Sequence, residues 1–146
     1  MATEGQLVVV GVDGSPESVA ALKWAAAYGA ATGARLRAVM AWHYPAAAGT
    51  APVGVAPAAI SEEVRQQMIE TLAKAVAEAA ADAEIEQQIG YGHPAQVLID
   101  QSADADLLVV GNRGHGAFTG MMVGSVSIHC VTHAHCPVVV VRADAG

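Results

Sequence analysis

Three segments of the chain are apolar almost throughout and rich in valine: residues 6–12 (QLVVVGV), 106–112 (DLLVVGN) and 137–142 (PVVVVR). Strands buried on both faces of a parallel sheet have this composition, whereas strands with one solvated face alternate between apolar and polar residues. Two further segments, 34–42 (ARLRAVMAW) and 84–90 (EIEQQIG), alternate in part. The pattern predicts five strands, of which 84–90 lies nearer an edge of the sheet.

Helical patterns separate these strands. Ser15 can cap a helix that has Pro16 at its first position and runs to about residue 32, because a serine hydroxyl accepts from first-turn N–H groups and proline needs no partner there. The expected buried face of this helix contains Val19, Leu22, Ala26 and Gly29. A longer helix is expected from about residue 60, with apolar residues at spacings of three and four: Val64, Met68, Leu72, Ala75 and Ala79.

Two shorter helices complete the pattern. One opens at His93–Pro94, and the other runs from Ser125 to about residue 134. A strand followed by a helix therefore occurs four times before the fifth strand. This order predicts an α/β fold, an open parallel sheet with helices on both faces, and a length of 146 residues suits one domain, 1–146.

Residues 43–59 (HYPAAAGTAPVGVAPAA) contain three prolines and show no periodicity. They are predicted to form a long loop between the second strand and the second helix. Loops of this length in a compact domain are usually disordered or cover a ligand, and the sequence leaves both alternatives open.

The charge balance narrows the classes of partner. Against 7 Lys+Arg the chain has 14 Asp+Glu, a formal net charge of −7, which argues against a protein that coats nucleic acid or an anionic membrane. The first apolar run, 7–12, is too short for a signal peptide or a membrane span. We therefore expect a cytoplasmic protein in which local groups hold any anionic ligand.

The segment 129–136 (HCVTHAHC) combines histidine with both cysteines of the chain. His129 and His133 are one helical turn apart and could share an ion, but zinc sites with two cysteines usually have tighter cysteine spacing. Cys130 and Cys136 are better explained as reduced thiols in the core. We therefore expect no structural metal in this segment.

The strongest chemical signal lies in residues 111–125 (GNRGHGAFTGMMVGS). Ligands of an open parallel sheet bind beyond the carboxyl ends of its strands, where the strand order reverses, and this places a crevice beside Asp13 and Gly111. Glycines let backbone N–H groups approach an anion, and the start of a helix adds oriented donors. With Gly124 and Ser125 opening the last helix, the segment can bind phosphate through backbone N–H groups and the hydroxyls of Ser125 and Ser127.

Two common phosphate loops do not fit. The Walker pattern needs Gly-Lys-Ser/Thr, yet no lysine lies between residues 75 and 146, and the first strand is followed only by Gly14 rather than by G-x-G-x-x-G. The spacing Gly111-x2-Gly114-x9-Gly124-Ser125 instead resembles the G-x2-G-x9-G-[ST] signature of the nucleotide-binding universal stress proteins.

The resemblance extends over nearly the whole chain. VVVGVDGSPES is similar to the first strand and turn of that family, VMAWHYP to its second strand and CPVVVVR to its closing strand. It implies a Rossmann-like single domain whose five parallel strands have the order 3-2-1-4-5.

The resemblance also implies a ligand and its contacts. The ligand is ATP, and a divalent cation such as Mg²⁺ or Mn²⁺ bridging its phosphates is left open. Asp13, with Gly11 beside it, is expected against the ribose or adenine, and the main chain from Val39 to Ala41 against the adenine edge. The residues expected at the phosphates are Gly111, Gly114, Gly124 and Ser125, with Val126 and Ser127 completing the helix start and Arg113 as an optional charged contact. Independently of the family, Asp13 could instead only support the turn before the first helix.

These residues favour an ATP-binding regulatory protein of the stress response over an enzyme, with slow hydrolysis or autophosphorylation left open. A long apolar edge strand invites pairing, and family members commonly dimerise through their last strand, so a homodimer through Pro137 to Arg142 is expected. Two alternatives stand beside this interpretation. One is a nucleotide-free interaction module, and the other is an enzyme acting on the α-phosphate of ATP.

Overall fold

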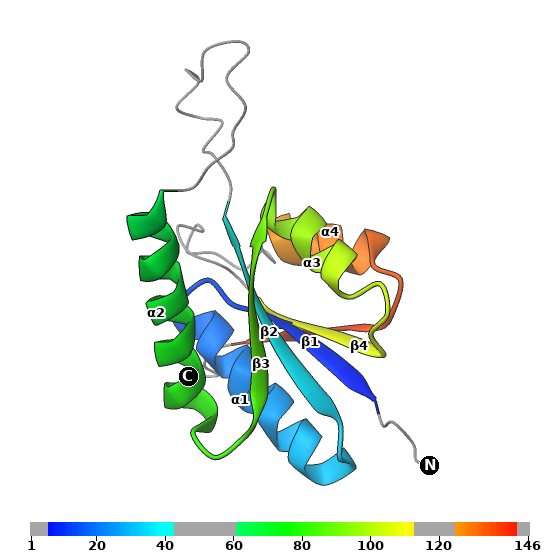
Figure 1. Cartoon of the computed structure of the whole chain (residues 1–146). Helices are drawn as coiled ribbons and strands as arrows, with labels where there is room; N and C mark the ends of the chain where they lie inside the picture. The colour runs from blue at the N-terminus through cyan, green and yellow to red at the C-terminus, as the bar shows by residue number, and fades with distance from the viewer. Residues whose placement is uncertain (1–5, 43–60, 113–124, 143–146) are drawn as a thin grey trace.

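The computed structural model describes residues 6–42, 61–112 and 125–142, which form a parallel sheet between two layers of helices (Figure 1). The strands are β1 (Leu7–Gly11), β2 (Arg35–Trp42), β3 (Ile85–Tyr91), β4 (Leu107–Gly111) and β5 (Val138–Val141). The helices are α1 (Pro16–Thr32), α2 (Glu62–Ala80), α3 (Pro94–Gln101) and α4 (Ser125–His133). Each predicted strand and helix is present within about two residues of its expected bounds.

The sheet is parallel throughout and has the order β3-β2-β1-β4-β5. This confirms the predicted order 3-2-1-4-5. The chain builds β1, β2 and β3 outward in one direction and then returns to the other side of β1 for β4 and β5. Strand order therefore reverses between β1 and β4, and the two central strands are the most completely buried.

Side chains from alternate strand positions form a separate core on each face of the sheet. On the α1/α2 face, Val8 and Val10 of β1 pack with Leu22 and Leu72 of the two helices. On the α3/α4 face, Leu7 and Val9 pack with Leu98 and Cys130. Because both faces are covered, β1 and β4 need apolar residues at every position, which explains their continuous valine and leucine runs.

The buried faces of α1 and α2 match the prediction in part. In α1, Leu22 and Gly29 are buried as predicted, whereas Val19 and Ala26 are only partly buried and Ala21 and Ala25 are fully buried. In α2, Leu72 and Ala75 are buried as predicted, together with Val76, and Val64 is exposed. Helix α1 contains seven alanines among its 17 residues and is weakly amphipathic, so its sequence period does not define the centre of its buried face.

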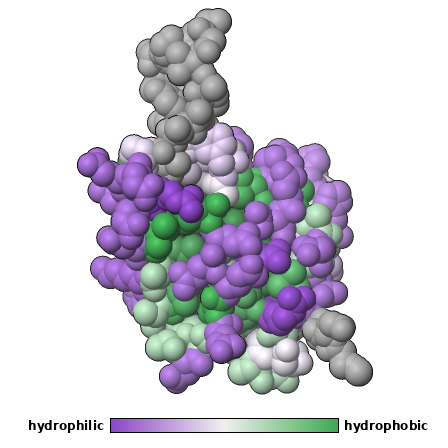
Figure 2. Space-filling view, in the orientation of Figure 1, coloured by the Kyte–Doolittle hydropathy of each residue, from purple (hydrophilic) through white to green (hydrophobic). Residues whose placement is uncertain are grey.

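Both outer strands are only partly buried. Strand β3 lies at an edge, as predicted, and Figure 2 shows hydrophobic surface between hydrophilic side chains on the side of the molecule where β3 runs. Strand β5 occupies the opposite edge despite its continuous valines, and all four of its residues are half-buried. Its side chains still pack on both cores, so the apolar run reflects covered faces and not a central position.

Strand β5 also has an open backbone edge, in that no strand within the described residues pairs with its outer side. Pro137 and Val141 direct their carbonyl groups to Leu108 and Asn112 at the β4 side. The backbone N–H and C=O groups of successive residues point to opposite sides of a strand, so the N–H group of Val140 points away from β4. None of the four described helices is long and apolar enough to cross a membrane.

Candidate functional site

The candidate site lies at the carboxyl ends of β1 and β4. From these neighbouring strands the chain turns to opposite faces, into α1 after β1 and toward α4 after β4 (Figure 1). In α/β proteins of this topology, ligands bind at the carboxyl ends of the strands, at the point where the strand order reverses. The structure thus brings Asp13 and Gly111 to the same edge of the sheet, as the sequence predicts.

Gly111 ends β4 where no side chain fits. A Cβ atom there would lie 2.8 Å from Cβ of Glu17 and 2.9 Å from that residue's main-chain carbonyl carbon and oxygen. The first turn of α1 therefore passes directly over the end of β4, and glycine permits this close approach. Gly11, at the end of β1, is enclosed differently, because its added Cβ would meet the flexible side chain of Leu98 on the other face.

The start of α4 is fastened to the end of β4. The buried hydroxyl of Ser127 donates a 2.6 Å hydrogen bond to the carbonyl oxygen of Gly111. This bond holds the first turn of α4 at the carboxyl end of β4. The Ser127 hydroxyl was expected to bind phosphate, but its proton is used in this bond to Gly111. Ser127 therefore positions the start of α4.

Ser125 and Val126 form the first turn of α4. Ser125 is exposed, whereas Val126 is half-buried and packs against the core on the α3/α4 face. The free N–H groups and partial positive charge of a helix start favour an anion at this position. Arg113, Gly114 and Gly124 lie outside the residues that the structure describes, as does the predicted loop at 43–59.

Asp13 is fixed by the turn between β1 and α1. Its Oδ1 atom accepts hydrogen bonds from the N–H group of Ser15 at 2.9 Å and from the Ser15 hydroxyl at 2.5 Å. The same hydroxyl oxygen caps α1 by accepting from the N–H group of Ser18 at 3.2 Å. Asp13 thus supports the turn, which was the alternative interpretation, and its exposed carboxylate also lies just beyond the carboxyl end of β1.

The main chain of β2 contributes one further hydrogen-bond donor and one acceptor at the carboxyl ends of the strands. The carbonyl of Val39 already accepts from the N–H group of Val12 at 2.9 Å, and Val39 pairs with Gly11, the last residue of β1. Strand β2 continues to Trp42, whose carbonyl accepts from Gly92 on the β3 side. Backbone groups two residues apart point the same way, so the N–H and C=O groups of Ala41 face the space beyond the end of β1. Within the predicted stretch from Val39 to Ala41, the main-chain groups of Ala41 are therefore the ones that face this space.

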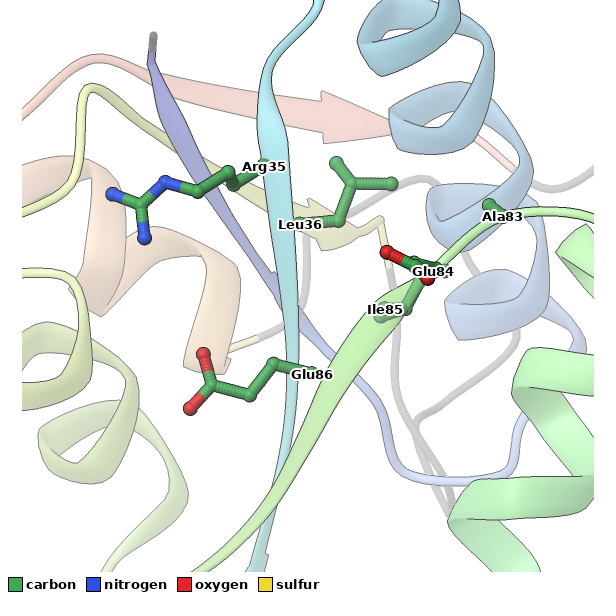
Figure 3. Close-up of a pocket in the computed structure, with 6 residues that line it drawn as sticks. All are labelled: Arg35, Leu36, Ala83, Glu84, Ile85 and Glu86. Atoms are coloured by element: carbon green, nitrogen blue, oxygen red, sulfur yellow. The ribbon is translucent and has the colours of Figure 1, made fainter. Parts of the chain in front are cut away.

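A hollow of the described surface lies at the opposite end of the sheet. It is open and lies at the amino ends of β2 and β3 (Figure 3), lined by Arg35, Leu36, Ala83, Glu84, Ile85 and Glu86. Beside it, Nε of Arg37 pairs with Oε1 of Glu86 at 3.1 Å, and this hydrogen bond lowers the pKa of Glu86. The guanidinium of Arg37 also donates to the carbonyl of Gln101 at 3.1 Å. Arg37 thus joins β2 and β3 to the end of α3, which is a structural role.

Both cysteine thiols are unbridged. Burial raises the pKa of Cys130 to about 11, and burial also raises the pKa of Cys136. Both residues belong to the core on the α3/α4 face, which confirms their interpretation as core thiols. A thiol held protonated is a poor nucleophile and a poor metal ligand.

Comparison with known proteins identifies the family. The family model described as "Universal stress protein family" matches residues 6–142. Universal stress protein Rv2005c of Mycobacterium tuberculosis is 36% identical over 138 residues, which are 92% of this chain and 45% of that protein. Universal stress protein Rv2623 of the same organism is 32% identical over 142 residues, 94% of this chain and 48% of that protein. The chain thus spans about half the length of the curated relatives that it matches.

Solved structures give the same fold. A universal stress protein crystallised in complex with cAMP has a TM-score of 0.71 and 28% identity, covering 97% of this chain and 100% of its own. A universal stress family protein of Arabidopsis thaliana with AMP bound has a TM-score of 0.64 at 21% identity, covering 96% and 93% of the two chains. At this lower identity the second likeness shows the fold alone.

Proposed function

Because this chain belongs to the universal stress protein family, we propose that it binds an adenine nucleotide at the carboxyl ends of β1 and β4. More specifically, we propose that this nucleotide is ATP. The observation that carries the proposal is the hydrogen bond from Ser127 to Gly111, which closes the glycine-rich segment onto the start of α4. A relative of 28% identity crystallised with cAMP supports the choice of an adenine ligand.

The groups at this edge suit the three parts of a nucleotide. Ala41 directs one N–H and one C=O past the end of β1, a pair complementary to N1 and the 6-amino group of adenine. Asp13 presents a carboxylate that can accept from a ribose hydroxyl. The N–H groups of the first turn of α4 and the Ser125 hydroxyl suit phosphate oxygens, and Gly114, Gly124 and optionally Arg113 are proposed to complete that contact.

Binding without fast turnover fits these groups better than catalysis does. Fast phosphoryl transfer uses positioned cations to stabilise the charge that develops on the phosphoryl oxygens. The described groups assigned to the ligand are instead main-chain amides, a hydroxyl and a carboxylate tied to Ser15. A divalent cation such as Mg²⁺ or Mn²⁺ would offset phosphate charge in a protein of net charge −7. We therefore propose a regulatory role, in which bound nucleotide alters partner affinity.

The first experiment identifies the ligand. The purified chain is denatured, released nucleotides are identified by mass spectrometry, and the refolded chain is titrated with ATP, ADP, AMP and cAMP by calorimetry. Asp13→Asn should weaken binding at least tenfold, whereas Asp82→Asn, at an exposed position in the turn before β3, should not. Absence of bound nucleotide together with no detectable titration would favour the nucleotide-free interaction module.

The second experiment tests recognition of the base. Hypoxanthine carries a hydrogen at N1 and an oxygen at C6, so it reverses the donor and acceptor that adenine offers to Ala41. An inosine nucleotide should therefore bind at least tenfold more weakly than the adenine nucleotide with the same phosphates. Equal affinities would refute the Ala41 contact while leaving the phosphate site standing.

We further propose a homodimer in which the β5 strands, with the flanking Pro137 and Arg142, pair antiparallel across a two-fold axis. The open backbone edge of β5 supports this, since unpaired strand edges associate readily. Val140→Pro removes an N–H that points away from β4, whereas Val140→Ala shortens the same side chain and keeps that N–H. Light scattering should show a dimer for the parent and Val140→Ala, and a monomer for a folded Val140→Pro. A parent monomer at micromolar concentration would contradict the proposal.

A further inference from the structure

Helix α4 carries a pair of histidines that the proposed nucleotide site does not use. Ser127 and Cys130 are the buried residues of this helix, whereas His129 and His133 are exposed and one turn apart. Their rings stack with centroids 4.6 Å apart and an interplanar angle of 29°. Two imidazoles at positions i and i+4 of a helix form a pair of nitrogen ligands on one face.

A backbone contact orients the second ring. Nδ1 of His133 lies 3.4 Å from the carbonyl oxygen of His129. A carbonyl oxygen can only accept, so in the tautomer that makes this contact Nδ1 carries the hydrogen and Nε2 has its lone pair available to a metal ion. Metal-bound histidines generally donate their other ring nitrogen to a carbonyl or carboxylate in this way.

We propose that His129 and His133 form a surface site for a late first-row divalent metal ion, Zn²⁺, Ni²⁺ or Cu²⁺, which the two imidazoles chelate while water completes the coordination. Metal–imidazole bonds of about 2.0–2.1 Å require the two nitrogens to approach to roughly 3 Å. Neighbouring rings on an exposed helix face reach this separation by side-chain rotation. The helix sequence SVSIHCVTH contains no lysine or arginine that would repel a cation.

Ligand chemistry separates this site from the proposed nucleotide site. Neutral imidazole favours zinc, nickel and copper, whereas Mg²⁺ prefers oxygen ligands. Affinity should be greatest for Cu²⁺, following the general order for nitrogen sites. The neighbouring thiol of Cys136 is held protonated by burial, which raises its pKa, so the cysteine is not part of the proposed ligand set.

The full chain, free of a histidine tag, is titrated with Zn²⁺ by calorimetry at pH 7.5, and with Mg²⁺ as a comparison. His129→Gln and His133→Gln should each weaken Zn²⁺ binding at least tenfold. His135→Gln, which removes an exposed histidine between α4 and β5, should leave it unchanged. All three positions are exposed, and circular dichroism checks that the variants remain folded.

A further measurement gives a readout other than affinity. Saturating Zn²⁺ should raise the melting temperature of the parent and not of His133→Gln, since a ligand stabilises the state that binds it. Parent-like affinity in both His129→Gln and His133→Gln, or an equal loss in His135→Gln, would overturn the proposal. Adenine nucleotide titrations of the same variants should not change, so this proposal and the nucleotide proposal fail independently.

Discussion

The hydroxyl of Ser127 donates a 2.6 Å hydrogen bond to the carbonyl oxygen of Gly111, and this contact joins the start of α4 to the end of β4. The two residues are 16 positions apart in the sequence, and the glycine-rich segment lies between them. Because the Ser127 side chain is buried, water cannot replace the bond, and its loss should move the first turn of α4.

We predict that Ser127→Ala lowers the free energy of unfolding by about 1–2 kcal/mol, since it leaves the half-buried carbonyl of Gly111 without this donor. It should also weaken nucleotide binding by displacing the N–H groups of α4. Thr132→Ala is the control on the same helix, because Thr132 donates a similar 2.8 Å bond to Ile128 at an exposed position. Urea denaturation and calorimetry measure both effects. Equal effects of the two substitutions would contradict the positioning role.

Ser15 links the cap of α1 to Asp13, and Ser61 provides a matched cap without such a link. Each hydroxyl accepts from an N–H group three residues later at 3.2 Å. Ser15→Ala and Ser61→Ala should therefore each lower the free energy of unfolding by about 1 kcal/mol, the usual effect of losing an N-cap. Only Ser15→Ala should reduce nucleotide affinity, because it also removes one of the two hydrogen bonds that hold Oδ1 of Asp13. Parent-like nucleotide affinity for Ser15→Ala would indicate that Asp13 serves the turn alone.

Gly111→Ala should be more destabilising than Gly11→Ala. The new Cβ at position 111 would meet main-chain atoms of Glu17 at 2.9 Å, whereas at position 11 it meets only side-chain atoms of Leu98. Overpacking of this kind costs about 1–3 kcal/mol, with the higher value where the backbone must move. Equilibrium unfolding in urea ranks the two variants, and the reverse order would show that α1 can shift away from β4 at little cost.

The thiol of Cys130 should make the fold sensitive to alkaline pH. Its pKa is raised from 9.0 to about 11 by burial, so the folded state favours the protonated thiol. This contribution to stability is complete below the unfolded pKa near 9.0 and is lost as pH rises toward 11. We predict that the free energy of unfolding falls more steeply between these values in the parent than in Cys130→Val. Parallel curves for the two proteins would show that the thiol does not contribute.

The same burial should protect Cys130 from alkylation. Iodoacetamide reacts with thiolates, and only the unfolded chain presents Cys130 at its ordinary pKa. Mass spectrometry of tryptic peptides should show modification of Cys130 in urea and little under native conditions at pH 8. Rapid native modification would mean that α4 opens readily from the sheet.

Local sequence patterns determined the elements of this protein and the place of its candidate site. Valine runs predicted β1 and β4 because strands covered on both faces tolerate no polar residue, and Ser15-Pro16 predicted the start of α1 because cap chemistry is local. The glycine spacing after β4 predicted the edge of the sheet at which a nucleotide would bind. The family match over residues 6–142 agrees with that interpretation.

Only the tertiary structure decided which polar groups at the carboxyl ends of the strands are available to a ligand. The apolar run of β5 does not by itself distinguish an edge strand from a central one, and its edge position was expected only from the family resemblance. The alanines of α1 gave no centre for its buried face. The Ser127 hydroxyl bonds to Gly111, and Ala41 rather than Val39 has outward main-chain groups. Both facts depend on contacts between residues that are distant in sequence. A local pattern of side chains does not predict which partner each polar group contacts.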